Sequence, residues 1–553
     1  MRFKIFNYPD SVGEIIKYNN KENSVMDLKN LTLHEKVCQM MVVKANPVKH
    51  IKQYGSIKNF MEKYPVGGVF ICNEMIYDKT FTVDKIREAV SEYQKYSKVP
   101  LLVAADSETS SKFLSDEFTT LPPCMALGSA GDKALAYDYG KAIAKECTSV
   151  GVNWAFAPVC DLIMNRYNEI VRTRSITDDP DIAAEMLSEE IRGFQENGML
   201  TTGKHFPGDG CDVRNQHIVG SVNNLSKEEW MNTFGKVYKA VFSAGLSAVM
   251  VGHISVPAFQ NDAENGVYPP ATLSRDVMHL LKETLGFKGV ALTDAMDMGG
   301  FVRWKYPRRQ AEVEAFKAGL DMMLWPREET ADLIEQGIES SEIPMSRLDD
   351  AIERIAFLKS KLEPFGFAPI EDETKSAFSR GVAEKLAATS STLANNSLNV
   401  IPVKAKEIKK VRIITSTEIF LSTRDGADKL SEFIAEKFRE HGAETEIKKE
   451  WDVYLEDFEA GEIDRDYDLI VYCAFSSSAL PMPGRELVNL HSAQRFDNDK
   501  TVVMVIGTPH YITEYFPTAE TVIHTYPDER CLADAVDGIY GDKPFLGEIP
   551  IRI

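Results

Sequence analysis

The 553-residue sequence has no apolar run that approaches the roughly 18 consecutive residues of a membrane-spanning helix. Its eight cysteines stand singly, without the C-x-x-C spacing of zinc ribbons and thiol redox motifs. We therefore expect reduced core thiols. The first fifteen residues also lack the apolar centre of a signal peptide, so the cytoplasm is the expected compartment, with secretion left open for a trimmed N-terminus.

Positive charge is in deficit, since 63 Lys and Arg residues face 83 Asp and Glu residues and the net charge is −20. Such a chain repels phosphate backbones and anionic lipid, so we expect neither nucleic acid nor a membrane as its partner. The hydrophobic share of 44% and the charged share of 26% are ordinary for a globular protein. The length exceeds what one core usually organises and predicts two or three domains.

Short apolar runs rich in β-branched residues alternate with amphipathic stretches through the first two thirds of the chain. This alternation is typical of repeated βα units around a parallel sheet. Eight such units predict an α/β fold with a (β/α)₈ barrel over residues 1–362, whose active site lies at the carboxyl ends of the strands. The expected strands are residues 39–45, 66–72, 100–106, 153–161, 200–206, 246–253, 289–295 and 321–326.

Ionisable residues close five of these eight runs. They are Asp106, Asp161, the pair Lys204 and His205, His253 and Asp294. Charged side chains at the end of an apolar strand are costly unless they are paired or used. Ion pairs at the barrel rim would explain one or two of them, whereas five favour a functional site.

Residues 363–378 are rich in Pro, Gly and acidic side chains and predict a linker. A second βα series follows over residues 379–553 and predicts a smaller α/β/α sandwich domain. Its expected strands are 411–417, 467–475, 501–509 and 521–527, and its expected helices are 426–442 and 528–541. This series has no G-x-G-x-x-G after its first strand and no P-loop, so it offers no support for nucleotide binding.

The segment from Gly203 to His217 concentrates titratable groups on a glycine-rich stretch. A metal site built from His205, Asp209, Asp212 and His217 is one interpretation, but the wandering spacing is unlike common zinc sites. The alternative is a long loop after the fifth strand, with a basic pair at its base and a histidine at its tip. His217 taken alone could equally be a solvent-exposed loop residue. We expect no metal and no organic cofactor.

Asp294 follows an apolar strand and precedes a pair of glycines, in a position suited to an ionised nucleophile or electrostatic stabiliser. Retaining cleavage of a glycosidic bond needs a carboxylate nucleophile and a proton donor on either side of the anomeric carbon. Asp294 and His217 could supply that pair.

The chain resembles glycoside hydrolase family 3, in particular its bacterial β-N-acetylglucosaminidases. The resemblance is carried by residues 31–43, 121–146, 151–165, 168–180, 204–210 and 292–300. It implies that Asp294 is the nucleophile and His217 the general acid/base. It further implies that sugar hydroxyls are bound by Asp106, Arg174, Lys204 and His205, in a pocket also lined by His253 and Met298.

The activity that this resemblance implies is a retaining exo-β-N-acetylglucosaminidase that removes terminal β-linked GlcNAc from muropeptides or chitooligosaccharides, as in peptidoglycan recycling. Three alternatives stay open: a phosphorylase of the same glycosides, a β-glucosidase of the family, and an impaired sugar-binding homologue. The expected partner is a small carbohydrate, and the sequence does not indicate the oligomeric state.

Two departures from the family pattern bear on this interpretation. The family has an Asp two residues before the catalytic His, where this chain has Asn215, natural or engineered. An amide can orient the imidazole but adds no negative charge, so we predict a lower pKa for His217. In the second departure, Thr109 and Ser110 replace two glycines and Lys112 is displaced from an arginine position, so the sugar subsite is expected to differ in detail.

Overall fold

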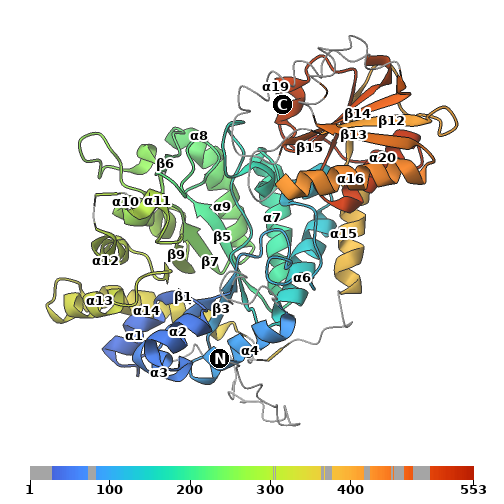
Figure 1. Ribbon diagram of the computed structural model, residues 1–553. Helices are drawn as coiled ribbons and strands as arrows, with labels where there is room; N and C mark the ends of the chain where they lie inside the picture. Colours follow the sequence, from blue (N-terminus) through green and yellow to red (C-terminus); the bar gives the residue numbers. More distant parts are fainter. Residues whose placement is uncertain are drawn as a thin grey trace, which may run out of the picture.

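The computed structural model describes residues 28–71, 82–302, 304–305, 307–362, 366–367, 376–415, 424–449, 453, 466–476 and 498–553. Figure 1 shows two assemblies: a barrel surrounded by helices, and a smaller helix-flanked sheet built from the last third of the chain. None of the helices among these residues combines the length with the apolar composition that crossing a membrane would require.

Eight parallel strands form the barrel, in the order β10-β1-β2-β3-β4-β5-β7-β9. A parallel bridge between Leu292 and Met322 brings the two ends of this sheet together. Each strand lies within one of the eight predicted runs, so the barrel prediction is confirmed. The strands are β1 Met41–Lys44, β2 Gly68–Phe70, β3 Leu102–Ala105, β4 Trp154–Ala155, β5 Leu200–Phe206, β7 Ala248–Val251, β9 Val290–Thr293 and β10 Met323–Leu324.

Helices cover the outside of the barrel (Figure 1). They are α1 Leu33–Gln39, α2 Pro47–Tyr54, α3 Ile57–Lys63, α4 Val83–Lys95, α5 Cys124–Ala130, α6 Lys133–Ser149, α7 Pro180–Gln195, α8 Lys227–Asn232, α9 Phe234–Ser243, α10 Arg275–His279, α11 Gly299–Val302, α12 Arg308–Ala318, α13 Thr330–Glu339 and α14 Met345–Ser360. Asp132 caps α6, and Ser226 caps α8 with Glu229 completing a capping box.

The continuous amphipathic stretch over residues 226–245 forms two helices, α8 and α9. The break lies at Thr233, whose φ of −111° and ψ of −96° are not helical. Its hydroxyl donates a hydrogen bond to the carbonyl oxygen of Glu229 at 2.7 Å, a local bond of the kind that competes with helix continuation.

Two short strands brace the loops above the barrel. β6 (Ser221–Val222) follows β5, and β8 (Ile254–Ser255) follows β7. They pair in parallel, with Ser221 opposite Ile254. The loop after β5, which carries His217, is therefore tied to the end of β7.

The second sheet has the order β11-β16-β15-β14-β12-β13. Its strands are β11 Thr392–Asn396, β12 Lys410–Thr415, β13 Glu444–Lys449, β14 Leu469–Ser476, β15 Thr501–Gly507 and β16 Thr521–Thr525. The four predicted strands are present, but the edge strands β11 and β13 were missed. β11 is largely exposed and β13 is mostly half-buried. Both are polar over most of their length, so they lack the apolar runs by which buried strands are recognised.

Helices lie on both faces of this sheet, as a sandwich requires. α16 (Arg424–Glu440) and α20 (Glu529–Tyr540) form one apolar cluster with alternate residues of its strands. α19 (His510–Tyr515) forms a second cluster with the intervening strand residues, which point to the opposite face. The α/β/α prediction is confirmed.

The proposed linker, residues 363–378, falls mostly outside the described residues. α15 (Ala377–Ser390) begins within its last two residues and packs its apolar side chains into the barrel's core cluster. The chain's end also returns to the barrel, where Thr177 Oγ1 donates to the carbonyl oxygen of Pro550 at 2.6 Å. The division at 363–378 stays a prediction.

Candidate active site

Charged side chains from three parts of the barrel meet at the carboxyl ends of its strands. Lys204 Nζ lies 2.7 Å from Asp106 Oδ1 and 2.5 Å from Glu108 Oε1. Glu108 also accepts two hydrogen bonds of 2.8 Å from the Arg174 guanidinium, one from Nε and one from Nη2. This bidentate pair fixes the geometry of the guanidinium. Asp106, Lys204 and Arg174, predicted separately, are thus brought together.

Lys204 and Glu108 are ionised because each has neighbours of opposite charge. Burial would lower the pKa of Lys204, but Asp106 and Glu108 more than offset it and the pKa is raised. Burial would raise the pKa of Glu108, but Arg174 and Lys204 hold it well below its usual range. Glu108 was not among the predicted site residues, although the retained acid in the segment after β3 was the available signal.

His205, at the end of β5, is oriented by Asp161 from the segment after β4. His205 Nδ1 lies 2.7 Å from Asp161 Oδ2, and the backbone N–H of His205 donates to Asp161 Oδ1 at 3.1 Å. Burial would lower the pKa of His205, but the negative charge of Asp161 raises it overall. The sequence identifies Asp161 as an acid at a strand end but indicates no role for it in the site.

Asp294 follows β9 and is buried beside His205. Its Oδ2 lies 4.0 Å from His205 Nε2, and its Oδ1 accepts a hydrogen bond from the N–H of Ala295 at 2.7 Å. Burial alone would raise the pKa of Asp294, but His205 and His253 bring it below the ordinary carboxyl value. The carboxylate is therefore available as an anion at neutral pH.

His253 and Met298 lie in the surroundings of Asp294 and are buried. His253 Nδ1 lies 3.0 Å from Thr272 Oγ1, and Nε2 donates to the carbonyl oxygen of Ala295 at 3.0 Å. Both ring nitrogens are thus hydrogen-bonded to protein atoms. Burial lowers the pKa of His253. The histidine anchors the segment that follows the carboxylate, while its predicted place in the pocket lining stays a prediction.

His217 stands on the exposed loop after β5 and is held by Asn215. In the tautomer with hydrogen on Nδ1, the imidazole donates to Asn215 Oδ1 at 2.8 Å, and the N–H of His217 donates to the same oxygen at 3.0 Å. The protein around the ring desolvates it enough to lower its pKa, although the charge of Asp294 opposes this shift. The two candidate catalytic groups therefore lie within electrostatic reach of each other.

Asp209 and Asp212, the two carboxylates considered above as metal ligands, are bonded to other groups of the protein. Asp209 accepts hydrogen bonds from Asn168, Gly210 and Gln216. Burial and the nearby Asp161 raise the pKa of Asp209 to about 6. Asp212 pairs with the Arg214 guanidinium at 2.7 Å. These bonds shape the loop.

A family model for the glycosyl hydrolase family 3 N terminal domain matches residues 32–358, more than half of the chain. The chain belongs to glycoside hydrolase family 3. It is thus a glycoside hydrolase, with the barrel as the part that the family model describes.

Relatives and solved structures support this family assignment along most of the chain. A β-N-acetylglucosaminidase/β-glucosidase of Cellulomonas fimi is 29% identical over 525 residues, 88% of each chain. Beta-hexosaminidase A of Pseudoalteromonas piscicida is 27% identical over 334 residues, 55% of each. The structure of beta-glucoside phosphorylase BglX bound to 2FGlc is similar with a TM-score of 0.80 and 25% identity, covering 95% of each chain.

A family 3 β-N-acetylglucosaminidase from Paenibacillus sp. str. FPU-7 has the same fold, with a TM-score of 0.81 at 22% identity. It covers 94% of this chain and 99% of its own. The match therefore includes the barrel and the second sheet together.

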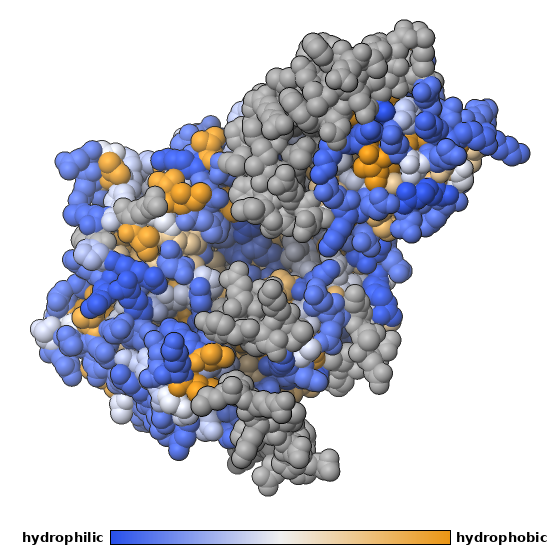
Figure 2. Space-filling view, viewed as in Figure 1, coloured by the Kyte–Doolittle hydropathy of each residue, from blue (hydrophilic) through white to orange (hydrophobic). Residues whose placement is uncertain are grey.

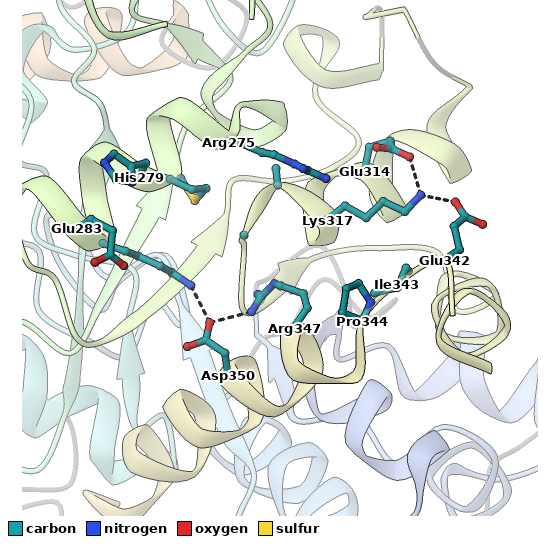
Figure 3. Close-up of a pocket in the computed structure, with 14 residues that line it drawn as sticks. Arg275, His279, Glu283, Glu314, Lys317, Glu342, Ile343, Pro344, Arg347 and Asp350 are labelled. Carbon is teal, nitrogen blue, oxygen red and sulfur yellow. Dashed lines mark hydrogen bonds and ion pairs between the residues drawn. The ribbon is translucent and has the colours of Figure 1, made fainter. Parts of the chain in front are cut away.

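An open pocket of about 590 Å³ lies at the opposite, amino-terminal end of the family 3 barrel. Figure 3 shows Lys317 between Glu314 and Glu342, and Asp350 within reach of Arg347. These opposite charges neutralise one another, and the pocket is far in the fold from the strand ends that carry Asp294. It takes no part in the candidate site.

Most of the described surface in Figure 2 is hydrophilic, and its hydrophobic residues form small separate groups. Such scattered groups are usual on a protein surface. The polar cluster at the barrel's strand ends is therefore the best-defined functional feature of the described residues.

Proposed function

We propose that this protein is a retaining exo-β-N-acetylglucosaminidase that releases terminal β-linked GlcNAc from muropeptides or chitooligosaccharides. The observation that carries the proposal is the buried Asp294 carboxylate, whose pKa is lowered and which lies within electrostatic reach of the His217 imidazole. A nucleophilic anion and a titratable proton donor are the two groups that retaining hydrolysis requires. The similarity to the Cellulomonas fimi enzyme supports GlcNAc as the sugar.

In the first half-reaction, a carboxylate oxygen of Asp294 attacks the anomeric carbon and the glycosidic bond breaks. His217, as imidazolium, donates its Nε2 proton to the leaving oxygen, because Nδ1 is hydrogen-bonded to Asn215. The products are a glycosyl ester of Asp294, the free aglycone alcohol and a neutral imidazole. Proton donation of this kind contributes about 10²- to 10⁴-fold to a rate.

In the second half-reaction, the neutral imidazole takes a proton from an incoming water as the water oxygen attacks the same carbon. The ester breaks, Asp294 returns to the carboxylate and the sugar leaves with its original β configuration. The lowered pKa of His217 favours this base step and weakens the preceding acid step.

The sugar in the subsite next to Asp294 would donate a charge-assisted hydrogen bond to Asp106 and accept such bonds from Lys204, His205 and Arg174. The ion pairs Lys204–Asp106 and Arg174–Glu108 hold three of these groups in position before the sugar arrives. Hydrogen bonds to charged groups are about twice as strong as neutral ones, which suits the recognition of hydroxyl groups.

The test is a panel of p-nitrophenyl β-glycosides of GlcNAc, glucose and xylose in phosphate-free buffer. We expect the highest kcat/KM for the GlcNAc substrate and a first product with β configuration by NMR. A preference for glucose would identify the β-glucosidase alternative, and a first product with α configuration would refute retention. Binding of GlcNAc without turnover of any activated substrate would identify an impaired sugar-binding homologue.

Phosphorolysis is the second candidate, because a neutral imidazole does not repel an incoming phosphate as a carboxylate would. The similar fold and 25% identity of the beta-glucoside phosphorylase support it. Repeating the GlcNAc assay in phosphate buffer decides between the two. Formation of GlcNAc-1-phosphate at the expense of free GlcNAc would replace hydrolysis by phosphorolysis as the main activity.

A further inference from the structure

The side chain of Gln216 lies inside the loop that exposes its neighbour His217. Gln216 is fully buried, with no exposed surface, while His217 is exposed. A polar amide is costly to bury unless its donors and acceptors are used. A loop that turns a glutamine inward is therefore expected to use it for hydrogen bonding.

Both ends of the Gln216 amide are hydrogen-bonded, one within its own loop and the other to the segment after β7. Its Nε2 donates to Asp209 Oδ2 at 3.2 Å, and its Oε1 accepts from the backbone N–H of His253 at 2.8 Å. Its own carbonyl oxygen accepts from the N–H of Gly300 at 3.0 Å. One residue thus connects the segments after β5, β7 and β9, the last of which carries Asp294.

The backbone of this loop packs closely against two glycines, Gly299 and Gly300. The carbonyl oxygen of His217 accepts from the N–H of Gly299 at 2.8 Å. A Cβ on Gly299 would lie 2.1 Å from the carbonyl oxygen of Ile218, and one on Gly300 would lie 2.7 Å from that of Gln216. The Gly299–Gly300 pair thus allows the backbone of the loop to approach the segment after Asp294.

We propose that Gln216 is the positioning residue that holds His217 over the Asp294 carboxylate. The inference rests on the proposed function, because it assigns the site's proton donor to His217. Gln216 does not touch the substrate. It presents a donor to the Asp209 carboxylate and an acceptor to a backbone N–H, a combination that an amide meets and an ionised Glu would not.

The test replaces Gln216 by Met, which has a similar volume and lacks both hydrogen bonds. Two GlcNAc substrates are compared, one with a 2,4-dinitrophenyl leaving group and one with a 4-methoxyphenyl group. The first leaves without protonation, whereas the second needs the acid. The measured quantity is kcat/KM, which reports only the steps up to release of the aglycone and so leaves out the later base step. We expect kcat/KM for the 4-methoxyphenyl substrate to fall about 10²-fold, as misplacing a catalytic group by about 1 Å can do. The dinitrophenyl substrate should lose less than about threefold in kcat/KM, which also shows that the variant is folded.

Gln39→Met is the matched control. Gln39 is also a buried glutamine, and its Nε2 donates to the carbonyl oxygen of Pro65 at 2.8 Å, away from the strand ends. This variant should change both substrates by the same factor. Should Gln216→Met not fold, Gly300→Ala displaces the same loop through the 2.7 Å contact and must give the same leaving-group dependence.

His217→Ala separates the inference from the function on which it rests. If His217→Ala slows the 4-methoxyphenyl substrate selectively while Gln216→Met and Gly300→Ala do not, the positioning role of Gln216 is wrong and the acid assignment stands. If His217→Ala itself shows no leaving-group dependence, the acid assignment fails. Selective loss in all three variants supports both.

Discussion

The parallel barrel sheet and the mostly parallel second sheet carry different kinds of side chain at the carboxyl ends of their strands. The barrel strands are followed by charged and titratable groups such as Lys204, His205 and Asp294. Four strands of the second sheet, β12, β14, β15 and β16, end in small neutral residues: Thr415, Ser476, Gly507 and Thr525. The edge strand β13 ends in Lys449, which forms an ion pair with Asp428. Carboxyl ends of parallel strands meet at one edge in both folds, so topology alone does not explain the difference.

The hydroxyl groups of the second sheet complete hydrogen bonds within the protein. Ser476 Oγ donates to the carbonyl oxygen of Thr508 at 2.9 Å, and Thr525 Oγ1 lies 2.8 Å from Ser391 Oγ. Neutral groups bonded in this way close the edge of a sheet at little cost. Buried charges are expensive, so their gathering at the barrel edge indicates use by a ligand. From this comparison we expect the barrel to carry the chemistry and the second sheet to give structural support.

Replacing the Asp294 carboxylate should cause the largest loss of activity. Asp294→Asn removes the nucleophile while keeping the side chain's shape, and we expect kcat to fall by about 10⁴-fold or more, as for other covalent catalysts. Steady-state turnover of p-nitrophenyl β-GlcNAc measures it. Mass spectrometry with a slow substrate should also detect a glycosyl-enzyme in the unmodified protein and none in the variant.

Asp297→Asn is the control for Asp294→Asn. Asp297 lies three residues further along and is exposed, with a 3.4 Å ion pair to Lys44. An exposed pair contributes little, so activity should stay within about twofold. If both variants lost activity equally, or if Asp294→Asn stayed fully active, the assignment of Asp294 as the nucleophile would be wrong.

Periodicity and composition predicted all eight barrel strands and the sandwich, because buried parallel strands are apolar runs between amphipathic helices. They missed β11 and β13, whose polar sequences lack that signal, and the break at Thr233, which depends on a local side-chain bond. The fold class could therefore be predicted where burial imposes a sequence pattern, whereas edge strands and single backbone irregularities could not.

The sequence predicted those residues of the candidate site that lie at the ends of apolar strands. Asp106, Lys204, His205 and Asp294 all close apolar runs, and the structure brings them together. Glu108 was not identified because its role depends on a bidentate bond to Arg174, 66 residues away. Gln216 was missed because a single polar residue in a polar loop gives no indication that its side chain turns inward.

Placing a negative charge beside His217 should strengthen acid catalysis at the barrel's strand ends. Asn215→Asp places a carboxylate where the amide oxygen now lies 2.8 Å from Nδ1, and so raises the pKa of His217. The acid step needs the imidazolium and fails as pH rises through that pKa. The alkaline limb of kcat for a 4-methoxyphenyl substrate should therefore move upward by about one pH unit, with faster hydrolysis at neutral pH.

Asn165→Asp is the control for this pH shift. Asn165 lies in the segment after β4, where its Nδ2 donates to the carbonyl oxygen of Cys211 at 3.0 Å. It adds a similar charge without bonding to His217, so the alkaline limb should move much less. A limb that does not move in Asn215→Asp, or an unchanged or lower rate at neutral pH, would show that the amide does not limit this enzyme's acid catalysis.

The smallest effect comes from changing one hydroxyl at each edge. Thr525→Val, at the end of β16, removes the hydroxyl bonded to Ser391, and Thr293→Val, at the end of β9, removes the acceptor of a 2.9 Å bond from the Leu324 N–H. Each should cost about 1 kcal/mol and lower the melting temperature by about 2–4 °C. Only Thr293→Val should also reduce kcat/KM, by about tenfold, because Asp294 is the next residue and a small displacement of the nucleophile slows the reaction. Paired melting curves and GlcNAc kinetics measure both properties; a similar loss of activity in Thr525→Val would give the second sheet a part in the chemistry and end the comparison.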